Sequence, residues 1–174
     1  MTTVRCFCAV ALTVLLAAPA VRAQEGAKPG PEHETLKKIV GTWDTTMKMM
    51  GMPESKGVAT YKMDLGGLWL ASTFEGDMGG TKFSGRGFDS YDAGKKKYVG
   101  VWFDSMTTSP MVMEGTYDKA SKTMTMTGDA PGMDGKMAKH KIVTVMPDDN
   151  TMNFAMYVGD VKEPAFTIVY KRKK

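Results

Sequence analysis

Clusters of methionine are the residues of this sequence with the most obvious chemistry. Four methionines fall within the six residues Met47 to Met52, and closely spaced pairs follow in segments 111–113 and 124–126. Thioether sulfur binds soft metals such as Cu(I), and the flexible methionine side chain also fills irregular cores and lines adaptable binding surfaces. The secondary-structure elements that carry the clusters decide between metal binding and core lining.

Carboxylates and histidines give less support for chemistry. Asp104 shares a face with Trp102, and Glu114 follows on the next expected strand, so the two could do acid–base work if their pKa values were split. Alternation nevertheless places Glu114 opposite its methionine neighbours, and Asp104 is typical of a residue that binds backbone near a turn. His140 could act as a base or an axial haem ligand, although no motif surrounds it. An enzyme and a haem protein stay open as alternatives, and the sequence assigns no catalytic residue and no cofactor.

The first 23 residues have the pattern of an export signal. Arg5 precedes an apolar run over residues 6–20 that is too short to span a bilayer comfortably. The motif VRAQ follows, and its small residues predict cleavage after Ala23. We therefore expect a periplasmic or secreted protein with no membrane anchor in the mature chain.

Cleavage changes the bulk properties of the chain. Cys6 and Cys8 leave with the signal, so the mature protein has no disulfide and no cysteine ligand for a metal. Arg5 and Arg22 leave as well, which lowers the net charge from +4 to +2. Apart from the basic tail at 171–174 the positive charge is scattered, which argues against a nucleic-acid partner.

Turn residues divide the mature chain into many short elements. Residues 24–31 read as a flexible leader, and a helix is expected between Pro31 and Gly41, with His33 facing solvent. About ten strands follow, separated by turns rich in Gly, Asp and Lys. Such a meander protects its edges best by closing, so residues 32–174 are predicted to form one all-β domain, a closed antiparallel barrel.

Period-two alternation assigns the faces of most strands. In the first strand Asp44 and Lys48 require water, so the residues between them face the interior; Leu65 is expected inside by the same count. The third and fifth strands are apolar on both faces, which leaves Trp69 against Leu70 and Trp102 against Phe103 open. The expected lining of the lumen is Trp43, Met47, Met49, Tyr61, Met63, Trp102, Asp104, Met111, Met113, Met124, Met126, His140, Met146, Phe154, Met156, Phe166 and Ile168.

Several segments resemble a bacterial secreted family known as domain of unknown function 1579. They are HETLKKIVGTWD, DLGGLWL, FSGRGFDSYDAGKKKYVGVWFDSM and MVMEGTYDKASKTMTMTG. The resemblance runs from His33 to Tyr170 and implies a lipocalin-like barrel without implying a reaction. The helix followed by Gly41 and Trp43 is also similar to the lipocalin opening, which implies that Arg172 at the end of the last strand lies over the Trp43 ring.

The sequence favours a binding protein for a small apolar or amphipathic molecule, because a barrel of about this size can hold one ligand in its interior. A filled barrel that binds nothing fits the same pattern. A periplasmic carrier of Cu(I) or Ag(I) would use the thioethers instead, although no residue is assigned as a metal ligand. The oligomeric state is not predicted.

Overall fold

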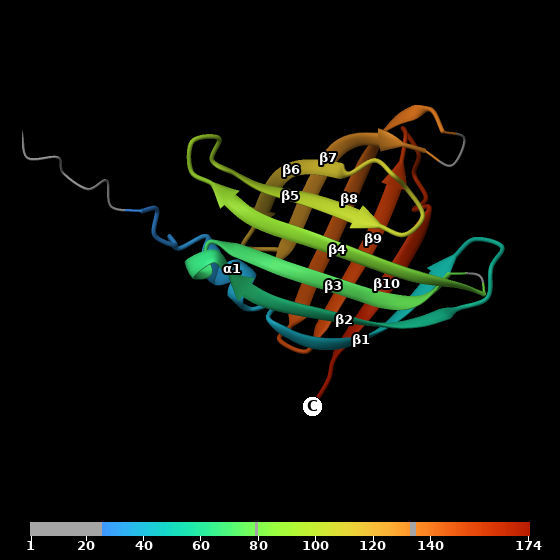
Figure 1. Ribbon diagram of the computed structural model, residues 1–174, viewed down its shortest axis with the longest axis horizontal. Helices are drawn as coiled ribbons and strands as arrows, with labels where there is room; N and C mark the ends of the chain where they lie inside the picture. Colours follow the sequence, from blue (N-terminus) through green and yellow to red (C-terminus); the bar gives the residue numbers. More distant parts are fainter. Residues whose placement is uncertain (1–25, 79, 133–134) are drawn as a thin grey trace, which may run out of the picture.

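A computed structural model describes residues 26–78, 80–132 and 135–174, and these form a closed β-barrel with one short helix (Figure 1). The predicted signal peptide, residues 1–23, lies outside the described residues. The elements are α1 (His33–Lys37), β1 (Gly41–Met49), β2 (Ser55–Asp64), the 3₁₀ turn η1 (Leu65–Gly67), β3 (Trp69–Met78), β4 (Thr81–Asp92), β5 (Lys97–Asp104), β6 (Met111–Asp118), β7 (Thr123–Pro131), β8 (Met137–Asp148), β9 (Thr151–Val158) and β10 (Phe166–Arg172).

The sheet is an antiparallel meander in which each strand pairs with its neighbours along the chain. The ring closes because β1 pairs with β10 over seven residue positions, from Trp43 opposite Arg172 to Met49 opposite Phe166. The predicted fold, a closed barrel of ten strands, is therefore confirmed. Closure pairs the first and last strands of the meander with each other, so neither β1 nor β10 is a free edge.

The helix α1 is shorter than the sequence pattern suggested. It packs one face on the barrel, where Leu36 belongs to a buried cluster with Leu70 and Tyr98. The Tyr98 hydroxyl donates to the Glu32 carbonyl at 3.1 Å. The expectation that His33 is solvated was wrong, since this residue is 4% exposed. Its Nδ1 accepts the Gly30 N–H at 3.1 Å, which ties the end of the leader to the helix.

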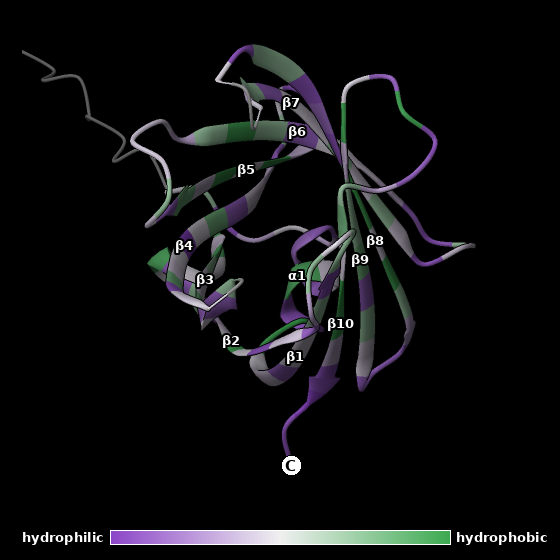
Figure 2. Ribbon diagram, turned by 90° about the vertical axis from the view of Figure 1, so that its right-hand side faces the viewer, coloured by the Kyte–Doolittle hydropathy of each residue, from purple (hydrophilic) through white to green (hydrophobic). Residues whose placement is uncertain are grey.

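Alternating side chains build the lumen, and bands of hydrophilic and hydrophobic residues follow one another along the strands (Figure 2). Every lumen residue expected from the sequence lies on an inward-facing position of its strand. Leu70 and Trp102 face inward, which resolves the third and fifth strands, while Phe103 is exposed. Leu65 contradicts the alternation and is 62% exposed, because the chain leaves β2 at Asp64 and turns with φ of 47° at Leu65.

The two ends of the barrel differ. We call the end beside α1 the helix end and the opposite end, with the β1–β2, β3–β4, β5–β6, β7–β8 and β9–β10 connections, the loop end (Figure 1). Several apolar side chains at the loop end are exposed, among them Met50, Met106, Met137 and Val161. Over the described ranges, no helix is long and apolar enough to cross a bilayer.

Candidate ligand site in the barrel lumen

Trp43 and Arg172 close the helix end of the barrel. The indole of Trp43 points inward and is 1% exposed, and its Nε1 donates to the Ile39 carbonyl at 2.9 Å. The guanidinium carbon of Arg172 lies 4.1 Å from the centroid of the indole ring, which is within reach of a cation–π contact. This is the contact that the sequence led us to expect.

The same guanidinium also binds the backbone around it. It donates to the carbonyls of Lys38 at 2.7 Å, Val40 at 2.5 Å and Asp149 at 2.8 Å. Gly41 follows with φ of 135°, a conformation that favours glycine, and a Cβ there would lie 2.6 Å from the guanidinium. The last strand is thereby fastened to the linker between α1 and β1.

Asp104 positions the ring of Trp102, which lies two residues before it on β5. The indole Nε1 of Trp102 donates to Asp104 Oδ2 at 3.0 Å, while Asp104 Oδ1 accepts the N–H groups of Met106 and Thr107 at 2.9 and 3.1 Å. The ring lies over Gly85, where a Cβ would overlap it. The carboxylate is therefore used to begin the β5–β6 connection and to hold the indole in place.

Methionine and aromatic side chains line the rest of the interior. They form two buried clusters: one contains Trp43, Met47, Met146 and Met152, and the other is built around Met113, Met124 and Met126. The rings of Phe154 and Phe166 stack with centroids 5.7 Å apart. The methionines of these two clusters thus belong to the inner wall, as the alternation predicted.

Several inward-facing side chains of the lumen are only partly buried. Tyr61 and Asp89 lie deep in the barrel, where protein surrounds them and raises their pKa values. Each nevertheless keeps part of its surface accessible to a water-sized molecule. The same is true of other inward-facing residues, namely Met63, Trp102, Met111, Phe154 and Phe166.

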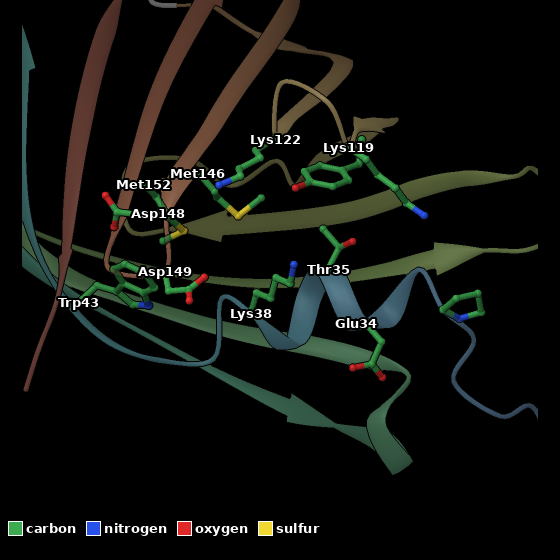
Figure 3. Close-up of a pocket in the computed structure, with 12 residues that line it drawn as sticks. Glu34, Thr35, Lys38, Trp43, Lys119, Lys122, Met146, Asp148, Asp149 and Met152 are labelled. Carbon is green, nitrogen blue, oxygen red and sulfur yellow. The ribbon is translucent and has the colours of Figure 1, made fainter.

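A pocket of about 370 Å³ opens at the helix end, beside α1 (Figure 3). The buried core residues Trp43, Met146 and Met152 contribute to its wall. Its charged lining residues are Glu34, Lys38, Lys119, Lys122, Asp148 and Asp149. Cations and carboxylates balance around this mouth, so its rim does not favour a ligand of one charge.

Asp89 is a lumen residue that the sequence analysis missed. On β4 it pairs with Leu70 of β3 and Gly100 of β5, and its carboxylate occupies space that a Cβ at Gly100 would overlap. Burial raises the pKa of this carboxyl from 3.8 to about 7. Within the described part of the chain, no group donates a hydrogen bond to it. We expected a strand ending at Asp89, whereas β4 continues to Asp92.

Tyrosines surround the lumen near this carboxylate. Burial raises the pKa of Tyr170 to about 12, and it raises the pKa of Tyr61 well above its usual range, with smaller contributions from Tyr170 and Asp89. Both phenols therefore stay neutral. The tyrosines on inward-facing positions are Tyr61, Tyr91, Tyr98, Tyr117 and Tyr170.

The residues considered for catalysis do not meet. Glu114 is on the outer face of β6, where Lys95 and Lys97 bind its carboxylate and hold its pKa below the usual range. His140 faces the lumen from β8, and its Nδ1 donates to the Ala138 carbonyl at 2.9 Å. In the described ranges, no group of three or more His, Cys, Asp and Glu side chains could hold a metal ion.

A protein family and a solved β-barrel are similar to this chain. The sequence model of a family described as Protein of unknown function (DUF1579) matches residues 28–172. The chain belongs to this family. A solved structure of a redesigned β-barrel is similar at 16% sequence identity, with a TM-score of 0.44, over 80% of this chain and 96% of that one. No curated protein matches the chain.

Proposed function

We propose that this member of the family binds a small apolar or amphipathic molecule inside the barrel. The observation that carries the proposal is the accessible surface that lumen residues retain deep in the interior, at Tyr61 and at aromatic and methionine side chains such as Trp102 and Met111. A structural barrel would have filled this space, since protein interiors are usually close-packed. Flexible methionines suit a wall that adapts to a ligand.

Titration with a neutral fluorescent probe, N-phenyl-1-naphthylamine, tests this function. Wild-type protein should show saturable fluorescence enhancement. Met113→Trp places extra volume on the buried inner wall and should abolish the enhancement, whereas Met137→Trp, on an exposed position of the loop end, should leave it intact. Circular dichroism checks that both variants fold. Equal binding by two folded variants would place the probe outside the lumen and reject the proposal.

We further propose that the protein works outside the cytoplasm. The support is the apolar run at residues 6–20 with the processing motif VRAQ behind it. N-terminal sequencing of protein from the periplasm or culture medium should give a chain that begins at Gln24. Recovery of the full-length chain in that fraction, beginning at Met1, would contradict cleavage.

A further inference from the structure

Two polar side chains in the lumen lack partners although protein encloses them. Ser72 is 7% exposed and lies next to Gly87 on β4, the strand that also carries Asp89. Neither the Ser72 hydroxyl nor the Asp89 carboxylate has a hydrogen bond to any residue that the structure describes. Their oxygens are not among the fully enclosed polar atoms of the structure, so a water-sized group can reach them. Two neighbouring acceptors that face the same interior without a protein partner indicate a place for a polar group of a ligand.

The charge of the lumen around Asp89 is negative. Strand lysines such as Lys48, Lys62 and Lys141 point outward and are exposed, and Arg172 lies at the helix end over Trp43. The titratable groups that face Asp89 are the phenols of Tyr61 on β2 and, beyond it, Tyr170 on β10. Among the residues that the structure describes, no cation contributes to the environment of this carboxylate.

The inward-facing tyrosine rings also favour a cationic ligand. Tyr91 follows Asp89 on the same face of β4, and its ring meets that of Tyr98 edge-on at 5.2 Å between centroids. Five of the six tyrosines point inward, and the sixth, Tyr157, stacks with Lys141 instead. Aromatic faces attract organic cations, most strongly where water is excluded.

We propose that the lumen binds an organic cation with an apolar tail, its ammonium group held by Asp89 and Ser72 among the inward-facing tyrosines. This inference rests on the proposed function and names the class of ligand. The ammonium donates hydrogen bonds to the carboxylate, which has acceptor oxygens only when it is ionised and presents no competing donor. The tail lies along the methionine wall of Met113, Met126 and Met156. An anionic ligand would instead face an unpaired negative charge in a poorly hydrated space.

The test compares three ten-carbon probes at pH 8, below their micelle concentrations, by isothermal titration calorimetry. Decylammonium, decanol and decanoate share one tail and differ in charge. Wild-type protein should bind decylammonium at least about tenfold more tightly than decanol, a difference of about 1.4 kcal/mol, and decanoate most weakly. In Asp89→Asn the preference for decylammonium over decanol should fall below about twofold, with decanol affinity retained.

Asp129→Asn is the matched control, because Asp129 is an exposed aspartate on β7, and it should keep the wild-type preference. Equal affinity of wild-type protein for decylammonium and decanol would overturn this inference and leave lumen binding in place. A preference that survives Asp89→Asn, or that favours decanoate, would overturn it too. Failure of all three probes to bind would overturn the proposed function itself.

Discussion

Arg172 at the helix end and Asp89 in the lumen are charged groups in opposite situations. At the helix end, the guanidinium of Arg172 lies on Trp43 and donates to three backbone carbonyls. In the middle, Asp89 and Ser72 face accessible space and have no hydrogen bond within the described chain. A charged group that binds the surrounding backbone fastens the fold, whereas a charged group left without a partner weakens the fold and favours a ligand.

The largest expected effect comes from replacing Arg172 at the helix end. Arg172→Lys should lower the free energy of unfolding by about 3 kcal/mol, because an ammonium loses the planar stack on Trp43 and most of the carbonyl contacts. Arg86→Lys is the matched control. Arg86 forms an exposed ion pair with Glu75, a kind of pair that contributes at most about 1 kcal/mol. Urea unfolding of the two variants measures both effects, and similar losses would mean that the helix end is not a special support.

The second prediction concerns the unpaired charge of Asp89 in the lumen. The pKa of Asp89 rises from 3.8 to about 7 on folding, so between these pH values the folded protein binds more protons than the unfolded chain. Stability from this group therefore falls as pH rises from about 4 to about 7 and stays low above that. Asp89→Asn should be neutral at pH 4 and should stabilise the protein by about 2 kcal/mol at pH 8. Thermal unfolding at both pH values checks this; stabilisation of equal size at both would assign the effect to something other than ionisation.

The third and smallest expected effect concerns the methionine wall. Replacing Met47 and Met49 with leucine should cost less than about 1.5 kcal/mol, because the two side chains are similar in volume and β1 places both toward the interior. Equilibrium unfolding measures this cost. Cu(I) titration of the same double variant separates a wall from a metal site. Stoichiometric Cu(I) binding by the wild type that is lost in the variant would favour the soft-metal alternative.

The spacing of turn residues was sufficient to predict the fold, and the faces of most strands followed from alternation. It worked best where charged residues mark the outer face, as Asp44 and Lys48 do in β1 and Lys139 and Lys141 do in β8. It could not orient β3 and β5, where Leu70 and Trp102 have apolar neighbours on both sides. The prediction for Leu65 was wrong because β2 ends at Asp64, and Leu65 begins a 3₁₀ turn that also contains Gly66 and Gly67.

Asp89 was missed for a physical reason. The inner face of β4 contains Gly85 and Gly87, so it shows no apolar period from which the position of Asp89 could be read. The folded structure explains why glycine is needed at these two positions. The Trp102 ring and the Ser72 hydroxyl occupy the space where a Cβ atom would be. Aspartate near the expected end of a strand is also typical of a turn. The polar part of the candidate site thus depends on contacts between strands.

Closure of the barrel by β1 and β10 also constrains when the chain can fold. The residues that meet there come from opposite ends of the domain, Trp43 and Arg172. Hairpins between consecutive strands are local contacts, but pairing of the first and last strands must wait until the last strand is available. During synthesis the N-terminal strands therefore spend time as an open sheet with β1 as a free edge. A chain that emerges in this order therefore completes its fold only after its last strand has been made.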